Sequence, residues 1–270
     1  MTVVWRFVRR HVLDAYALLA LLYLFVPISV VVAFSFNNPL GRFNYTWQGF
    51  TFKNWMHPFN YPGLSSAIKI SIEIAFLSSI VATILGTLIA LALVRYRFRG
   101  SATTNLLIFI PMTTPEIVMG ASLLTLFLNW RIPQGFGTIL IAHIMFNISF
   151  VVVTVRARLV GFDRHLEEAA MDLGANEFVT FWRVTLPLIA PGILAGFLLA
   201  FALSIDDFVI TYFNAGTVTT FPLFVWGAAR VAVPAQINVI GTTIFAIAVL
   251  GMLANVLIQN HRARRASASA

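Results

Sequence analysis

The chain has 270 residues, of which 59% are hydrophobic and only 10% are charged. Its mean hydropathy is +0.87, and soluble domains carry roughly 25% charged residues, so the composition excludes an ordinary water-soluble protein. The absence of cysteine excludes disulfide frameworks, thiolate metal sites and cysteine nucleophiles. The net charge of +8 does not indicate a nucleic-acid partner, because most arginines stand in short clusters between apolar runs.

Six apolar runs are each long enough to cross about 30 Å of hydrocarbon at about 1.5 Å per helical residue. A lipid bilayer offers no partner for free backbone groups, so these runs must be helices. They cover residues 14–36, 64–94, 103–128, 136–155, 188–213 and 237–258. The first run is too long for the apolar part of a signal peptide and reads as an uncleaved anchor. We therefore expect an all-α polytopic membrane protein with six transmembrane helices.

Lysine and arginine predict the orientation of these helices. Thirteen of the 18 lysines and arginines flank the termini, the loop between runs two and three, or the loop between runs four and five. Only five stand on the other side: Arg42, Lys53, Lys69, Arg131 and Arg230. The positive-inside rule therefore predicts that both termini and the loop between runs four and five are cytoplasmic.

The first external loop, residues 37–62, is polar and rich in aromatic residues. It fits either an aromatic belt at the membrane interface or a docking surface for an external partner. We divide the chain into the anchor helix with this loop, residues 1–62, a membrane core, residues 63–260, and a tail, residues 261–270, that we expect to be disordered.

Three acidic residues lie inside the expected spans without a cation on the same helix within a turn: Glu116, Asp206 and Asp207. Charges near the centre of a transmembrane helix are costly and usually face a pathway or a partner. Glu116 follows the segment from Pro111 to Pro115, where a broken helix is expected beside a cavity. One interpretation is a lining that attracts a cationic solute; the other is hydrogen bonding to polar groups of neighbouring spans.

Other polar or small residues in the spans favour structural roles. Lys69 stands four residues before Glu73 and is placed to neutralise it. His143 fits a hydrogen-bonded packing group between helices better than a ligand. Gly192 and Gly196 have the spacing of a close-packing helix face, although that pattern is weak evidence.

The loop between runs four and five predicts two short helices. Asp163 is placed to cap the first, with Glu167 and Glu168 in its first turns, and Gly174 is placed to end it. Asn176 is placed to cap the second, and Pro187 then precedes the next span. Such a hairpin either docks on a partner or simply links two spans in water.

The spacing in this loop resembles the cytoplasmic coupling loop of ABC importer permeases. Glu168-Ala169-Ala170 is followed after three residues by Gly174, and after nine more by Val184 and then Leu186-Pro187. Val184 stands where isoleucine is more usual. The resemblance implies that the loop inserts into a groove of an ATPase subunit, and it favours docking over a simple link. The residues that it assigns to this coupling are Glu168, Ala169, Ala170, Asp172, Gly174, Leu186 and Pro187.

Further segments resemble the family of spermidine/putrescine importer permeases, and within it the second of the two permease subunits. These segments are Phe34 to Asn37, Trp47 to Phe50, Arg95 to Gly100, Pro115 to Met119 and Leu203 to Phe208. The resemblance implies the ABC type I importer permease fold and the bacterial inner membrane. It also implies a second, different permease chain, an ATPase subunit dimer and an external solute-binding protein as partners.

The resemblance implies no cofactor and no enzyme activity in this chain, because the partner ATPase binds ATP. In agreement, the sequence has no Gly-x-x-x-x-Gly-Lys-Ser/Thr loop for a nucleotide. Related permeases for thiamine, iron and other solutes share the coupling loop, so only Glu116, Asp206 and Asp207 favour a polyamine as cargo. Two other classes remain: a secondary transporter that uses these acids as an ion relay, against which the coupling loop argues, and a membrane enzyme or insertase, which no nucleophile or metal cluster supports.

Overall fold

The computed structural model describes residues 2–96 and 98–268, and regular structure in this part of the chain is helical. Two isolated β-bridges, Asn37 with Phe50 and Phe43 with Val233, are the exceptions. The elements are α1 (Thr2–Ser35), α2 (Lys53–Met56), α3 (Leu64–Arg95), α4 (Ser101–Thr113), α5 (Glu116–Asn129), α6 (Phe136–Val160), α7 (His165–Asp172), α8 (Glu177–Thr180), the π-helical turn η1 (Phe181–Thr185), α9 (Leu186–Asp206), α10 (Val209–Asn214), α11 (Phe221–Val231) and α12 (Ala235–Ala268).

The number of spans in the described residues is four, or five if a bent pair of helices is counted as one span. The four are His11–Ser35, Leu64–Arg95, Phe136–Val160 and Glu177–Asp206. The sixth expected span falls in α12, whose apolar described part, Ala235–Gly251, is shorter. The all-helical, polytopic character is therefore confirmed, with fewer uninterrupted spans than expected.

The third expected span, residues 103–128, is not one helix. Helix α4 ends at Thr113 and α5 begins at Glu116, and the two axes differ by 107°. Thr114 is extended, with φ −75° and ψ 130°, because the ring of Pro115 disfavours the helical conformation of the preceding residue. The fifth expected span, residues 188–213, is also interrupted: α9 ends at Asp206 and α10 begins at Val209.

Two compact units make up the chain: residues 1–62 with 225–270, and residues 63–224. The expected membrane core of residues 63–260 therefore extends beyond the second compact unit, because α12 packs against α1. Helix α12 continues through Ala268, so the tail expected to be disordered from residue 261 is helical as far as the structure describes it.

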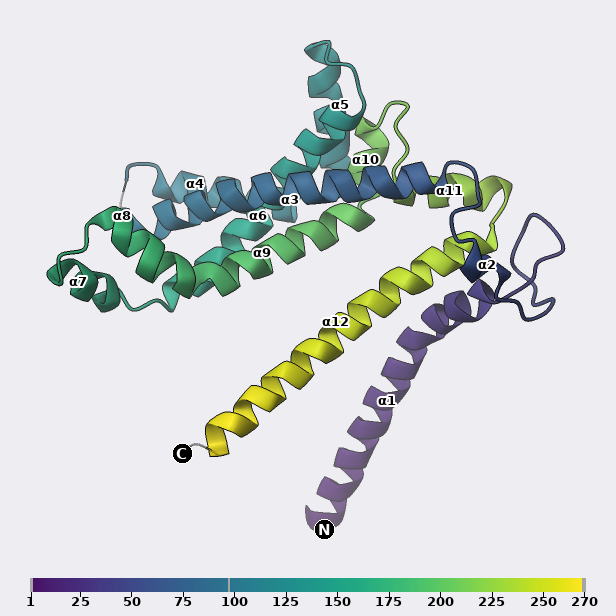
Figure 1. Ribbon diagram of the computed structural model, residues 1–270, viewed down its shortest axis with the longest axis horizontal. Helices are drawn as coiled ribbons and strands as arrows, with labels where there is room; N and C mark the ends of the chain where they lie inside the picture. The colour runs from purple at the N-terminus through teal and green to yellow at the C-terminus, as the bar shows by residue number, and fades with distance from the viewer. Residues whose placement is uncertain (1, 97, 269–270) are drawn as a thin grey trace. The chain divides into compact units, whose positions relative to one another are not determined.

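In the first unit, α1 and α12 meet beside α2 (Figure 1). Phe25 packs edge-on against Phe245 with ring centroids 6.5 Å apart. The aromatic loop folds around the buried side chain of Asn37, whose Nδ2 donates to Asn44 Oδ1 at 2.6 Å. Phe36 stacks on Trp55 with centroids 5.3 Å apart. Part of the aromatic loop is thus a small core of its own.

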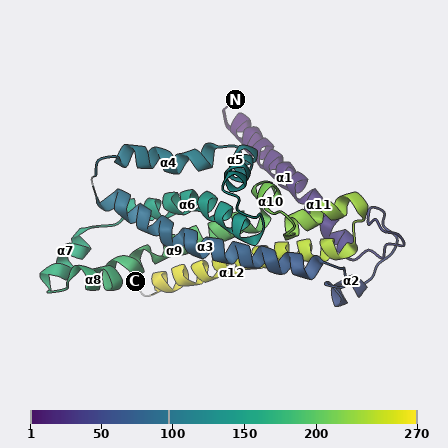
Figure 2. The same cartoon turned by 90° about the horizontal axis from the view of Figure 1, so that it is seen from above.

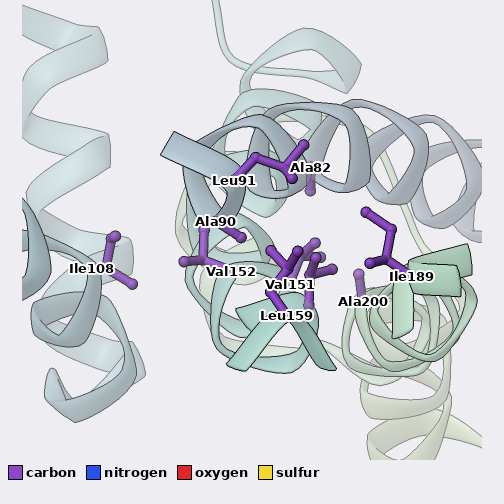
Figure 3. Packing of buried hydrophobic residues seen from close by; sticks show 10 residues of the cluster. Ala82, Ala90, Leu91, Ile108, Val151, Val152, Leu159, Ile189 and Ala200 are labelled. Atoms are coloured by element: carbon purple, nitrogen blue, oxygen red, sulfur yellow. The ribbon is translucent and has the colours of Figure 1, made fainter. Parts of the chain in front are cut away.

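In the second unit, α3, α6 and α9 pack side by side, and α4 lies along α6 (Figures 1 and 2). Figure 3 shows buried side chains of α3 and α9, most of them small or β-branched, gathered around Val151 and Val152 of α6. A Cβ at Gly86 would lie 2.7 Å from Val151 Cγ1. A Cβ at Gly192 would lie 2.7 Å from Arg158 Cβ, and one at Gly196 would lie 3.4 Å from Val151 Cγ1. The close-packing face predicted from Gly192 and Gly196 is therefore confirmed against α6.

Candidate functional site: the α7–α8 hairpin and the acid cluster

The α7–α8 hairpin, residues 163–187, begins with an acidic cap. Asp163 precedes the N-cap residue Arg164, and its Oδ1 accepts the backbone N–H of His165 at 3.0 Å. Glu167 and Glu168 follow in the first turn, where carboxylates are stabilised by the positive end of the helix dipole. The acidic first turn is therefore confirmed, whereas the N-cap residue is Arg164, and the predicted cap Asp163 supports the helix start from one residue earlier.

Gly174 ends α7 in a left-handed conformation with φ +90°. Its N–H donates to Met171 O at 2.9 Å, and the N–H of Ala175 donates to Ala170 O at 3.1 Å. These two bonds form a Schellman motif, in which glycine avoids the steric penalty of a Cβ at positive φ. The predicted helix-ending role of Gly174 is confirmed.

The second arm starts as expected but does not stop before the membrane span. Asn176 Oδ1 accepts the N–H of Val179 at 2.8 Å and caps α8. The helix then passes through η1 into α9, with Leu186 N–H donating to Phe181 O across the π-helical turn. Because Pro187 lacks an N–H and its ring crowds the preceding turn, a local widening of the helix lets it continue. We expected Pro187 to precede the next span; the structure places Pro187 inside a continuous helical run, Glu177–Asp206, that includes the second arm.

The outer face of the hairpin exposes large apolar side chains. Leu173 is 90% exposed and Phe178 is 71% exposed. Leu166, Met171 and Trp182 are also exposed, and none of the residues of α7, all of which the structure describes, is buried. Exposed apolar groups gathered on one element are typical of a surface that binds another protein.

The residues that resemble the family's coupling motif lie on this surface or at its base. Glu168 is exposed and its Oε2 lies 3.1 Å from His165 Nδ1. Ala169, Asp172 and Gly174 are exposed and Ala170 is half-buried. Leu186, half-buried, and Pro187, exposed, stand where the hairpin joins α9.

Glu167 faces the opposite way from Glu168, and its role was not anticipated from the sequence. Its carboxylate accepts from Arg95 Nη2 and from Thr185 Oγ1. Arg164 Nη2 donates to Val94 O at 2.8 Å beside this cluster. The sequence did contain a signal for this role: two consecutive glutamates on a helix point about 100° apart, so they cannot both face the same partner.

At the other end of α9, the structure brings the three acids of the spans together. Glu116 opens α5 and Asp206 closes α9, and both are exposed. Glu116 lies within electrostatic range of the carboxylates of Asp206 and Asp207. Helix α5 packs closely on α10 at Gly120, where a Cβ would lie 2.8 Å from Phe213 Cδ2. Sequence spacing alone could not place α5 against α10.

Asp207 differs from the other two acids because it is buried and fully engaged. Its Oδ2 accepts from the N–H and Oγ1–H of Thr211 at 2.8 and 2.7 Å, which caps α10. The same Oδ2 lies 3.2 Å from His143 Nε2. Of the two interpretations given for these acids, a cation-attracting lining and hydrogen bonding to neighbouring helices, the second therefore applies to Asp207.

His143 connects four helices through polar side chains. Its Nε2 lies 2.9 Å from Thr211 Oγ1, and its Nδ1 lies 2.6 Å from Ser204 Oγ. Ser204 Oγ is 3.1 Å from Ser78 Oγ of α3. Since the Thr211 hydroxyl donates to Asp207, it can only accept from His143, so Nε2 carries a proton. The packing interpretation of His143 is confirmed by this geometry.

The remaining acid of the spans is paired near the start of α3. Lys69 Nζ lies 3.8 Å from Glu73 Oε1, four residues along the helix. The predicted pair is confirmed, and its solvent exposure makes it a small contribution to stability.

Comparisons with known proteins agree with this arrangement. The family model for the binding-protein-dependent transport system inner membrane component matches residues 82–266. The chain is 40% identical over 243 residues to the spermidine/putrescine transport system permease protein PotC of Escherichia coli, covering 90% of this chain and 91% of the relative. It is 37% identical to PotC of Haemophilus influenzae, covering 91% and 95% of the two chains. It is also 37% identical to the putrescine transport system permease protein PotI of Escherichia coli, covering 92% and 91%.

Solved structures support the fold. A chain of a bacterial ABC transporter for import of the acidic polysaccharide alginate superposes with a TM-score of 0.65 at 18% identity, covering 95% of this chain and 96% of that one. A chain of the MetNI methionine ABC transporter gives 0.58 at 15% identity, covering 72% and 94%. The ABC importer permease fold expected from the sequence is therefore confirmed. The chain belongs to the family of inner-membrane components of binding-protein-dependent transport systems.

Proposed function

We propose that this permease imports polyamines such as spermidine and putrescine. The observation that carries the proposal is the acid cluster of Glu116, Asp206 and Asp207, in which the start of α5 meets the end of α9 that is remote from the α7–α8 hairpin. The relatives that are 37–40% identical are named for spermidine and putrescine transport. Fixed carboxylates in a low-dielectric region suit a cargo with several positive charges.

In this proposal the three acids have two different roles. Glu116 and Asp206 are exposed and offer solvent-accessible carboxylates to the cargo. They offset part of the loss of hydration that a polyamine suffers on entering the membrane. Two shallow contacts suit passage better than one deep site, because the cargo must leave again. Asp207 supports the pathway by holding the break between α9 and α10 that presents Asp206.

The α7–α8 hairpin is the proposed contact with an ATPase subunit dimer. The exposed apolar residues Leu173 and Phe178 would enter a groove of the ATPase, and Glu168 would pair with a cation there. In this arrangement both termini are cytoplasmic, and a second, different permease chain and an external solute-binding protein complete the importer. The small side chains of Ala169 and Ala170 would let the partner backbone approach closely.

Uptake of radiolabelled spermidine tests the proposal in proteoliposomes that contain the complete importer. Glu116→Gln and Asp206→Asn keep shape and remove charge, and each should lower uptake by about tenfold, equivalent to roughly 1.4 kcal/mol. Glu73→Gln is the matched control, because this acid is paired with Lys69 and exposed at the start of α3, and it should leave uptake unchanged. Wild-type uptake in both pathway variants would refute the polyamine assignment, and uptake without ATP would refute the importer mechanism.

A further inference from the structure

The two adjacent glutamates of α7 have opposite environments. The side chain of Glu168 is 63% exposed, whereas that of Glu167 is 16% exposed. Glu168 belongs to the face that is free to bind a partner. Glu167 points back into its own subunit, so the two residues serve different purposes.

Glu167 joins three segments that are far apart in the chain. Its Oε1 accepts from Arg95 Nη2 at the last turn of α3 and from Thr185 Oγ1 in η1. Arg95 Nη2 also donates to Thr185 Oγ1 at 3.2 Å, so the three side chains form a closed triangle. Thr185 is fully buried. Charge-assisted bonds of this kind, partly shielded from water, are stronger than exposed ion pairs.

This triangle joins the side chain of Glu167 in α7 to α3 and η1, beside a second bond in which Arg164, the N-cap residue of α7, donates to Val94 O of α3. The helix α7 buries none of its own residues, all of which are described, and its main packing partners are α8 and η1 rather than α3. Without the triangle, the single neutral-acceptor bond from Arg164 to Val94 O would remain between α7 and α3, and the charge-assisted bonds of Glu167 would be lost. With it, α7 is tied to the end of α3 and to the start of α9.

The same two helices are tied together again near the acid cluster. Ser78 of α3 and Ser204 of α9 lie 3.1 Å apart, and Ser204 contacts His143 in the network that holds Asp207. From Arg95 to Ser78 is about 25 Å along α3 at about 1.5 Å per residue. A pair of rigid helices linked at both ends can carry a displacement from the hairpin to the acids.

We propose that Arg95, Glu167 and Thr185 form a latch that transmits the movement of the hairpin to α3 and α9. They are positioning residues: Glu168 and the apolar face bind the ATPase, and the latch passes the resulting displacement on. This inference rests on the proposed coupling function of the hairpin. It predicts that breaking the latch separates ATP hydrolysis from transport without releasing the ATPase.

The test uses the complete importer in proteoliposomes with its external binding protein. Glu167→Gln and Arg95→Met should each leave the ATPase subunits associated, as judged by co-purification. The rate of spermidine uptake per ATP hydrolysed should fall by about tenfold, within the range typical of coupling between sites. The kcat for uptake should fall and the KM for spermidine should stay unchanged, because the variants leave the cargo site intact.

A charge exchange separates coupling from folding. The double variant Arg95→Glu with Glu167→Arg restores an ion pair in the opposite sense and should recover part of the lost uptake per ATP. Lys69→Met with Glu73→Gln removes an exposed ion pair of α3 and should have no effect. Wild-type uptake per ATP in both single variants, or loss of ATPase association in them with no recovery in the exchange, would overturn the latch.

A second readout does not depend on the identity of the cargo. Binding-protein stimulation of ATP hydrolysis should fall to the basal rate in Glu167→Gln, because signals from the external side also pass through the latch. If the wild-type complex hydrolyses ATP on stimulation but imports no polyamine, the proposed cargo is refuted. The latch can then still be tested, by comparing stimulated ATP hydrolysis in the wild type and in Glu167→Gln. Full stimulation in Glu167→Gln would overturn the latch alone.

Discussion

The α7–α8 hairpin and the acid cluster both place polar groups in a largely apolar chain, but they satisfy them differently. In the hairpin, Glu168 and Asp172 remain exposed and large apolar side chains surround them. In the acid cluster, Asp207 is buried and each of its polar contacts comes from within the subunit. A surface that awaits a partner contributes little to the stability of the isolated subunit, whereas a buried network contributes much. Substitutions of Asp207 should therefore lower stability, whereas substitutions on the hairpin surface should lower transport.

The largest effect on stability is expected at Asp207. The change Asp207→Ala removes the cap of α10 and leaves His143 and Thr211 without their acceptor. A buried hydrogen-bonding group left without its partner costs about 1–3 kcal/mol. Thermal unfolding of the purified subunit in detergent should show this loss. The neighbouring change Asp206→Ala, at an exposed site, should shift the unfolding free energy by less than about 0.5 kcal/mol. Equal losses in the two variants would contradict the distinction between them.

The hairpin should show the reverse signature at Gly174. The left-handed conformation of this residue is also accessible to Asn and Asp, and within the described residues a Cβ there would meet nothing within 4 Å. Gly174→Asp should therefore insert and fold, yet lower ATP-driven uptake by about tenfold or more, because a new charge would enter the docking groove. Gly174→Asn has nearly the same shape without the charge and should retain most uptake. Equal uptake in the Asp and Asn variants would contradict the prediction that the added negative charge lowers uptake.

A smaller effect is expected where α5 packs on α10. Gly120→Ala places a methyl group 2.8 Å from Phe213 Cδ2 and 3.4 Å from Ile210 Cα. Overpacking of this kind costs about 1–3 kcal/mol. It should also move Glu116 away from Asp206, so uptake should fall together with stability. Gly137→Ala in α6 is the control, because its Cβ would meet nothing within 4 Å in the described part of the chain; an unchanged Gly120→Ala protein would show that this contact is loose.

The orientation of the two regions can be checked without altering function. The chain contains no cysteine, so single cysteines report their location directly. Leu40→Cys, at an 86% exposed site in the first loop, should react with a membrane-impermeant thiol reagent added outside intact cells. Leu173→Cys, at the tip of the hairpin, should react only after the membrane is opened. The opposite labelling would reverse the proposed topology and place the hairpin out of reach of an ATPase.

Local patterns predicted the hairpin well because short-range rules govern it. Asp163 and Asn176 begin helices, and Gly174 ends one, through contacts within six residues in the chain. Such contacts depend on backbone geometry that residue type alone constrains. The pair of Lys69 and Glu73 was predictable for the same reason, because residues four apart on a helix are neighbours.

The breaks in the third and fifth runs were harder to predict from hydropathy. Hydropathy averages over a window, and the segments around Pro115 and Asp207 are apolar enough to be counted with their neighbours. The prolines indicated irregularity in the third run, but the 107° angle between α4 and α5 depends on how α5 packs against α10. In the fifth run, the interruption depends on Asp207 capping α10 while His143 of another helix holds it.

The sequence by itself determined the membrane class, the helical content and the position of the hairpin, because burial in lipid forces apolar runs into helices and charge forces the rest into water. Only the tertiary structure decided which acids are free and which are engaged. Asp206 and Asp207 are chemically identical and adjacent, as are Glu167 and Glu168. Along α7 one residue is a turn of about 100°, and at the end of α9 the helix stops at Asp206 and the backbone of Asp207 is extended. Packing against the neighbouring helices therefore decides which carboxylate finds partners inside the subunit and which is left to meet a cargo or an ATPase.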